Sequence, residues 1–122
     1  MIARPGFLLD EHLPRALVVA LRQAAPTMHV DVVGRGRAPA LGTPDPALMR
    51  WIEEHSCRLV TNNRASLPRH LADHLAAGRH VPGILVVPRR LLGWRVLIDD
   101  LVLIWEAAAP DEFGDRIEHL PL

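Results

Sequence analysis

Lysine and tyrosine are absent from this chain of 122 residues, and cysteine occurs once, as Cys57. A single cysteine excludes an intramolecular disulfide, so the fold depends on its apolar core, and a reducing cytoplasm is the natural compartment. Cys57 opens an apolar run, which favours a small buried residue over a reactive thiol. A phosphoacceptor receiver domain is also excluded, because that fold needs a lysine late in its sheet.

Net charge and long apolar segments are lacking as well. Fourteen basic and fourteen acidic residues balance, so the overall charge does not draw the chain toward nucleic acid or a membrane. Asp10 and Glu11 interrupt the region where a signal peptide needs an unbroken apolar stretch. Asp99, Asp100 and Glu106 interrupt the most apolar later segment, so we expect no membrane span and a soluble cytoplasmic protein.

What the chain does contain is a regular alternation of two apolar periodicities. Apolar residues make up 49% and charged residues 23%, proportions typical of one globular domain over residues 1–122. Short apolar runs predict strands at 7–9, 29–33, 58–61 and 83–87, with a further strand in the tail at 115–122. Helical spacing predicts helices at 13–24, 48–52, 67–75 and 94–108. The alternation predicts an α/β fold, a three-layer sandwich with a mostly parallel sheet of four or five strands and helices on both faces.

Polar side chains follow the first and third predicted strands. Asp10 and Glu11 come directly after the first strand, and Asn62 and Asn63 come after the third. The strand-to-helix connections of a parallel sheet leave from one edge, so we expect these residues to share that edge with Asp45. Asp10 and Glu11 have two interpretations: a carboxylate pair for Mg²⁺ or Mn²⁺, or acids that favour the positive N-terminal end of the next helix.

Asp45 lies in the segment TPDPALM, where a proline follows the aspartate. One interpretation is a helix N-cap, with Pro46 at the first helical position. The other interpretation is a carboxylate at the edge of the sheet, where it would join Asp10 in binding a metal ion.

Arginines gather in the connections that are predicted at this edge. Arg35 and Arg37 lie in the loop GRGRAPALG, and Arg64 and Arg69 flank the connection after the third strand. Guanidinium groups around an acidic centre suit a phosphate backbone, so these four are candidate nucleic-acid-binding residues. Ordinary solvated loops are the alternative interpretation. The same loop lacks the third glycine and the following helix of a dinucleotide-binding fingerprint.

Two histidines, His70 and His74, lie four residues apart on a predicted helix, which places both imidazoles on one face. No cysteine or acid at metal-ligand spacing completes a zinc site, although Asp73 is adjacent. We therefore predict a structural or solvent-facing pair.

The helix predicted at 94–108 has more apolar residues than one helical face needs. Val96, Val102, Leu103 and Ile104 lie beyond its core stripe. We predict that this surplus covers a neighbouring element or forms the interface of a homodimer.

Four segments occur along the chain in an order that is familiar from one family. They are FLLDEHLP at the start, an Asp that opens the second helix, RLVTNN as the third strand and HVPGILVV as the fourth. Together they resemble the small PIN-like family, which is related to the PIN-domain ribonucleases, the VapC-type toxins and the Mut7-C-like domains. The resemblance runs from about Phe7 to the final HLPL.

The chain also differs from the family pattern. The first strand of the family usually reads Leu-Leu-Asp-Glu-Asn-Leu-Pro, and here His12 replaces the Asn. The third strand of the family ends Thr-x-Asp-x-Asp-Phe. Thr61 matches this pattern, whereas Asn63 and Ala65 stand where the two acids would be and Ser66 replaces the Phe.

The resemblance implies a divalent-metal-dependent ribonuclease of toxin-like type, in which acids hold Mg²⁺ or Mn²⁺ and a metal-oriented water attacks the RNA backbone. Asp10 and Asp45 would be primary ligands, Glu11 an auxiliary one, and Asn63 a ligand position without its charge. Because an Asn keeps a carbonyl oxygen, the site would be weakened rather than abolished. The alternative is a PIN-like module that has lost its chemistry and binds RNA or a protein partner such as an antitoxin.

Overall fold

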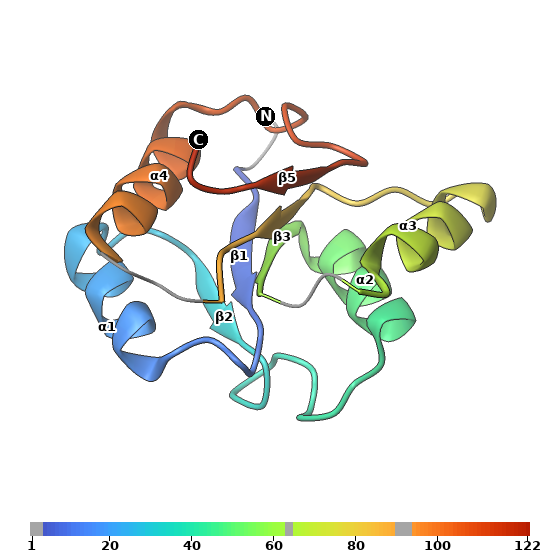
Figure 1. Cartoon of the computed structure of the whole chain (residues 1–122), viewed down its shortest axis with the longest axis horizontal. Coiled ribbons are helices and arrows are strands. Elements are labelled where there is room, and N and C mark those ends of the chain that lie inside the picture. Colours follow the sequence, from blue (N-terminus) through green and yellow to red (C-terminus); the bar gives the residue numbers. More distant parts are fainter. Residues whose placement is uncertain (1–3, 63–64, 90–93) are drawn as a thin grey trace.

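The computed structural model of the chain describes residues 4–62, 65–89 and 94–122, in which strands and helices alternate strictly (Figure 1). The elements are β1 (Gly6–Leu9), α1 (Arg15–Ala24), β2 (Val30–Val32), α2 (Asp45–His55), β3 (Cys57–Thr61), α3 (Leu67–Ala76), β4 (Ile84–Val86), α4 (Trp94–Ala107) and β5 (Ile117–His119). This order confirms the predicted alternation, and the strand expected in the tail is present as β5.

The strands form one sheet in the order β2-β1-β3-β4-β5, and every neighbouring pair is parallel. β1 is flanked on both sides, with Leu8 aligned with Asp31 of β2 and with Leu59 of β3. Two parallel strands cannot be joined by a tight hairpin turn, and each connection between consecutive strands contains a helix. The predicted α/β class is therefore confirmed, and the described sheet is parallel throughout.

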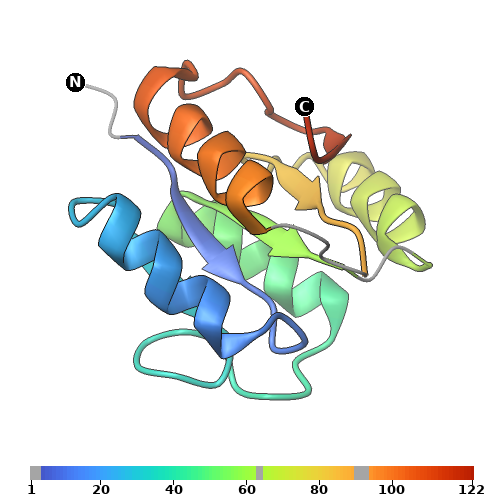
Figure 2. The same ribbon diagram turned by 60° about the vertical axis from the view of Figure 1, so that its left-hand side comes forward.

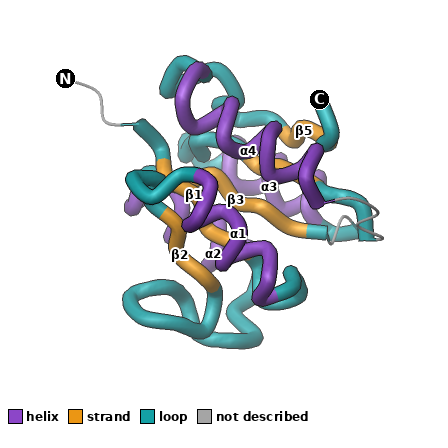
Figure 3. The backbone as a smooth tube through the Cα atoms, turned by 90° about the vertical axis from the view of Figure 1, so that its left-hand side faces the viewer, coloured by secondary structure: helices purple, strands orange, loops and turns teal. Residues whose placement is uncertain are grey.

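Two helices cover each face of this sheet, which gives the predicted three layers. α1 and α4 lie side by side on one face (Figure 2), where they pack on Phe7, Leu9 and Val60. α2 and α3 cover the other face and pack on Leu8 and Leu59, behind the sheet in Figure 3. Side chains of a strand alternate between faces, so the two cores take alternate residues from the same strands. Burial on both faces explains why the strands are nearly continuous apolar runs.

β3 carries one charged side chain into this apolar centre. Arg58 is 1% exposed, and its guanidinium donates hydrogen bonds to the carbonyls of Ala109 (3.0 Å) and Pro110 (3.4 Å). The same group lies 5.3 Å from the ring centroid of Phe113. Burial lowers the pKa of Arg58 from its usual value. Arg58 therefore ties the middle of the sheet to the segment that leads to β5.

Two sequence-based predictions concern individual apolar side chains. Cys57 is 2% exposed and burial raises the pKa of its thiol to about 11, which confirms a small buried residue. In α4, Ile104 is buried and Val102 packs against the core, so half of the predicted surplus covers neighbouring elements. Val96 and Leu103 are exposed. Within the described residues, no helix has the length and apolar character that crossing a membrane requires.

Candidate functional site

The first predicted site residue, Asp10, lies where β1 ends and is 8% exposed. Its Oδ2 accepts a hydrogen bond from the hydroxyl of Thr61 at the end of β3 (2.7 Å), and its Oδ1 accepts one from the N–H of Glu11 (2.8 Å). The N–H of Asp10 donates to the carbonyl of Val60 (2.9 Å). These donors are neutral, so they orient the carboxylate without cancelling its charge.

The second predicted site residue, Asp45, is the first residue of α2 and is partly buried. Its Oδ2 accepts a hydrogen bond from the hydroxyl of Ser66, which directly precedes α3 (2.6 Å). The N-cap interpretation of Asp45 is wrong, because Pro44 occupies that position and makes no side-chain cap hydrogen bond. The carboxylate lies in the first turn instead, where a negative charge still favours the helix.

Asp10 and Asp45 are thus both bound to the connection between β3 and α3. Thr61 stands at one end of this connection and Ser66 at the other, so two hydroxyls bind acids from distant parts of the sequence. The expectation that the two acids share the carboxyl-end edge of the sheet fits this placement. Asn63 and Arg64 fall on the same connection and lie outside the described residues, so the predictions for Asn63 and Arg64 stay predictions.

Glu11, the predicted auxiliary ligand, is exposed, and its Oε1 accepts a hydrogen bond from the N–H of Gly42 (3.1 Å). α1 begins only at Arg15 and has no acid in its first turn, which counts against helix stabilisation as the purpose of Asp10 and Glu11. A cavity of about 270 Å³ lies beside Glu11. Its lining includes Arg15 and Arg35.

The candidate arginines of the described residues differ in their surroundings. Arg37 donates to both carboxylate oxygens of Asp31 (3.1 and 2.8 Å) and lies 5.5 Å from the ring centroid of Trp51. The hydrogen bond to Asp31 raises the pKa of Arg37. Arg35 lines the 270 Å³ cavity, and Arg69 is exposed in the first half of α3. Arg35 and Arg69 are therefore better placed than Arg37 to meet a phosphate.

The donor types at this edge suit a hard divalent cation, because carboxylate oxygens are the ligands that Mg²⁺ and Mn²⁺ prefer. Within residues 4–62, 65–89 and 94–122, no group of three or more His, Cys, Asp and Glu side chains is arranged to hold a metal ion. Asp10 and Asp45 thus fit such a cation in chemistry but would need further ligands, from water, from phosphate or from the connection that contains Asn63.

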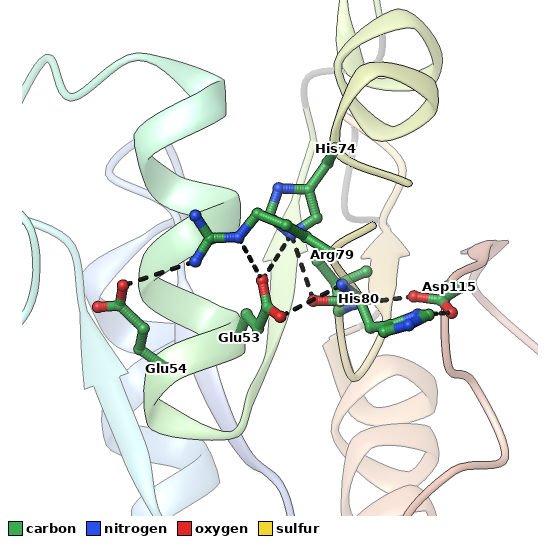
Figure 4. Close-up of polar contacts among 7 residues, drawn as sticks. Glu53, Glu54, His74, Arg79, His80 and Asp115 are labelled. Atoms are coloured by element: carbon green, nitrogen blue, oxygen red, sulfur yellow. Dashed lines mark hydrogen bonds and ion pairs between the residues drawn. The ribbon is translucent and has the colours of Figure 1, made fainter. Parts of the chain in front are cut away.

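A second group of charged side chains lies at the opposite edge, where the strands begin (Figure 4). Glu53 is its centre: Oε1 contacts Nε2 of His74 (2.9 Å) and Nε of Arg79 (3.0 Å), and Oε2 accepts a hydrogen bond from the N–H of His80 (3.3 Å). Burial raises the pKa of Glu53, but the hydrogen bonds from Arg79, His80 and His74 outweigh it and leave the pKa below its usual value. His74 is 7% exposed, in keeping with a structural histidine.

His80 and Asp115 form a second pair in this group, drawn beside Glu53 in Figure 4. Nδ1 of His80 lies 2.8 Å from Oδ2 of Asp115, and the N–H of Val81 donates to Oδ1 (2.8 Å). Burial raises the pKa of Asp115, and the hydrogen bonds from Val81 and His80 outweigh it, so this pKa also lies below its usual value. A cavity of about 470 Å³ is lined by both residues and by Ser56.

Several of these residues were not indicated by the sequence pattern. Ser66 stood out only as a replacement for a family Phe, whereas in the structure it binds Asp45. The signal that could have found it is a hydroxyl residue directly before a predicted helix. For Arg58 the signal is an arginine inside an apolar strand. Glu53 and Asp115 carry no local signal, because their partners come from other elements.

Comparisons of the chain with protein-family models, curated proteins and solved structures found no match. The PIN-like resemblance therefore stays a prediction that depends on the motifs quoted above. A functional proposal depends on those motifs together with the placement of Asp10 and Asp45.

Proposed function

We propose that this chain is a divalent-metal-dependent ribonuclease of the PIN-like, toxin-like type, with its site at the carboxyl-end edge of the sheet. The main support is that Asp10 and Asp45 are held at one short connection by the hydroxyls of Thr61 and Ser66. Ligands of catalytic metals are commonly oriented by such secondary hydrogen bonds. A carboxylate that is oriented but not neutralised is suited to binding a cation.

Mg²⁺ or Mn²⁺ would be held by Asp10 and Asp45, with Glu11 and Asn63 as further candidate ligands. When bound, the ion supplies an activated water and stabilises charge at the phosphate. The burial of Asp10 and its two hydrogen bonds fix one carboxylate orientation before any ligand arrives. Preorganisation of this kind reduces what the protein must rearrange during the reaction.

RNA phosphates would be bound by Arg35 and Arg69 in this proposal. Both side chains are exposed and belong to the loop after β2 and to α3, two elements that meet this edge. Guanidinium contacts with phosphate make binding strongly salt-dependent. A toxin-type ribonuclease would also have an antitoxin-like protein as its partner, and covering this edge is the simplest way for such a partner to act.

A titration with Mn²⁺ followed by melting temperature tests the metal site, because an ion that binds only the folded state stabilises it by mass action. We expect the melting temperature of the wild-type chain to rise with Mn²⁺ and that of Asp10→Asn to stay unchanged. Asp111→Asn, at an exposed aspartate of the opposite edge, is the matched control. Cleavage of a single-stranded RNA should require Mn²⁺ and disappear with EDTA. A chain that neither responds to Mn²⁺ nor cleaves RNA would exclude the ribonuclease.

A binding module without catalysis is the second candidate function. It is favoured by the finding that the described residues contain no group of three or more metal-ligating side chains. In that case Asp10 and Asp45 would serve the connection between β3 and α3, by accepting hydrogen bonds from its hydroxyls. A gel-shift assay in EDTA distinguishes the two candidates, because a binding module would retain RNA or its protein partner without metal.

A further inference from the structure

α1 and α4 form a helical layer whose outer side faces away from the sheet (Figure 2). The two helices carry opposite charge. α1 contains two arginines and no acid, whereas α4 contains three acids and one arginine. This layer covers a face of the sheet rather than its carboxyl-end edge, so an inference about it does not depend on the proposed ribonuclease activity.

The exposed side of each helix has an apolar residue between two charged ones, and the charges are positive on α1 and negative on α4. We call these two sets of residues the α1 stripe, which reads basic, apolar, basic, and the α4 stripe, which reads acidic, apolar, acidic. The residues are Arg15, Val19 and Arg22 in the α1 stripe and Asp99, Leu103 and Glu106 in the α4 stripe, both with a spacing of four and then three. This spacing places the three residues of each stripe on one side of their helix.

All six side chains of the two stripes are exposed. Val19 on α1 is 51% exposed, and α4 has two exposed apolar side chains, Leu103 at 53% and Val96 at 56%. None of the ion pairs within the described residues involves the four charges of the stripes. Arg22 donates a hydrogen bond to the carbonyl of Val30 (3.3 Å), which leaves its charge uncompensated. Apolar residues flanked by unpaired charges have the anatomy of an interface with a polar rim.

We propose that the α1 stripe of one copy of this chain binds the α4 stripe of a second copy, and the reverse, in a homodimer with two-fold symmetry. α1 and α4 each connect two parallel strands and pack on the same face of the sheet, so both run back against the strands and share one direction. A two-fold axis parallel to the helices then places α1 of each copy over α4 of the other. In this arrangement Arg15 faces Asp99 and Arg22 faces Glu106, and symmetry makes each contact twice.

The size of the layer sets the expected strength of this dimer. α1 has 10 residues and α4 has 14, which correspond to lengths of about 15 and 21 Å. With the axes about 10 Å apart, the patch measures about 20 by 20 Å, so each copy contributes about 400 Å², roughly half of what a standard stable interface has. We therefore expect a reversible dimer that dissociates at low protein concentration and weakens as salt screens the charges.

Charge reversal with complementation tests the proposal. Sedimentation velocity from about 5 to 500 µM, a range suited to a small interface, should show a monomer–dimer equilibrium for the wild-type chain. The acidic variant, Arg15→Glu with Arg22→Glu, and the basic variant, Asp99→Arg with Glu106→Arg, should each dimerise at least about 100-fold more weakly, because like charges then face each other at all four contacts. An equimolar mixture of the two should regain dimers, because each acidic stripe then meets a basic one in the other chain.

The control is Arg50→Glu with Asp73→Arg, a charge reversal at exposed sites on α2 and α3, which should dimerise like the wild type. Circular dichroism of each variant verifies that it is folded. A wild-type chain that stays monomeric throughout this concentration range would overturn the proposal. So would dimers that persist in both reversed variants, or a mixture of the two that remains monomeric.

Discussion

Both edges of the sheet hold carboxylates, but they hold them with different partners. At the carboxyl-end edge Asp10 and Asp45 accept hydrogen bonds from hydroxyls and a backbone N–H. At the amino-end edge Glu53 and Asp115 contact arginine and histidine side chains. A cationic donor such as Arg79 strengthens its pair with Glu53 and balances the carboxylate charge, whereas a neutral donor leaves the charge for another ligand. The carboxylates of the amino-end edge therefore connect neighbouring elements, whereas those of the carboxyl-end edge keep the charge that the proposed metal site requires.

The sizes of the two cavities alone would suggest the opposite assignment. The cavity at the amino-end edge is about 470 Å³ and the one beside Glu11 is about 270 Å³. Volume is a poor guide to the proposed metal site, because a hard divalent ion needs oriented oxygen ligands rather than a large space. Ligands also bind preferentially at the carboxyl ends of parallel strands.

Removing both charges at the carboxyl-end edge should have the largest effect. In Asp10→Asn combined with Asp45→Asn, the amide oxygens still accept from the N–H of Glu11 and the hydroxyl of Ser66, and the amide NH2 at position 10 donates to the hydroxyl of Thr61. We therefore expect unfolding free energy to change by only about 1 kcal/mol. Affinity for Mn²⁺, measured by calorimetry, should fall by at least about 100-fold, because both charged ligands are lost. Unchanged Mn²⁺ affinity would mean that the ion binds elsewhere, and a large loss of stability would mean that the acids are structural.

The corresponding change at the amino-end edge should affect stability. Glu53→Ala leaves the buried His74 and the half-exposed Arg79 without their shared carboxylate, at a cost of about 2 kcal/mol in unfolding free energy. Urea denaturation measures the change. Glu54→Ala is the matched control, because this neighbour is 60% exposed and meets Arg79 only at 3.8 Å. We expect less than about 0.5 kcal/mol from the control. Equal losses of unfolding free energy in the two variants would show that the contacts of Glu53 with His74 and Arg79 do not stabilise the fold.

Restoring a charge on the connection between β3 and α3 should have an intermediate effect. The resemblance assigns Asn63 to a ligand position, so Asn63→Asp should tighten Mn²⁺ binding by about tenfold, as an added carboxylate outweighs repulsion from Asp10 and Asp45. Calorimetry on the two chains under the same salt conditions measures it. If Mn²⁺ affinity stays the same while stability falls by about 1 kcal/mol, the amide serves the turn instead.

Acid titration should give the smallest effect. The pKa values of Glu53 and Asp115 are raised by burial and lowered more strongly by hydrogen bonds, so both lie below their usual values in the folded chain. Such groups stabilise the fold above their unfolded pKa and lose this contribution as pH falls through the folded one. Unfolding free energy should therefore decrease below about pH 4, and less steeply in Asp115→Asn.

The matched control for this titration is Asp111→Asn, which should keep the wild-type slope. Asp115 has a φ of 59°, a conformation that asparagine also tolerates, so Asp115→Asn should retain the backbone turn. Identical slopes for all three chains would show that Asp115 does not contribute to acid stability.

The sequence allowed the architecture to be predicted because its signals are local. Each strand is a short apolar run bounded by Gly, Pro or a charged residue. Strands that alternate with helices form a parallel sheet, because each helix returns the chain to the edge where the next strand begins. That topology alone brings Asp10 and Asp45 to one edge. The N-cap at Asp45 was predicted wrongly, because an aspartate before a proline has the composition of a cap while Pro44 already accepts the first helical hydrogen bonds.

The partners of the charged residues could not be predicted in the same way. Glu53 meets Arg79 because α2 and α3 pack on the same face of the sheet, and Asp115 meets His80 because β5 lies beside β4. Such pairings depend on where whole elements dock, and no spacing within a single element signals them. Ser66 is a similar case, since its hydroxyl donates to Asp45, which lies on α2, 21 residues earlier in the chain.

The two outermost strands, β2 and β5, have a consequence for how this protein can assemble. Each is three residues long, and each has an acid at its centre, Asp31 in β2 and Glu118 in β5. Short strands with a charged residue are poor templates for the addition of a strand from another chain. On β2 the ion pair between Asp31 and Arg37 places a second charge over this edge. Growth into fibres by extension of the sheet is therefore disfavoured, in keeping with the closed two-fold dimer that we propose through the helical layer.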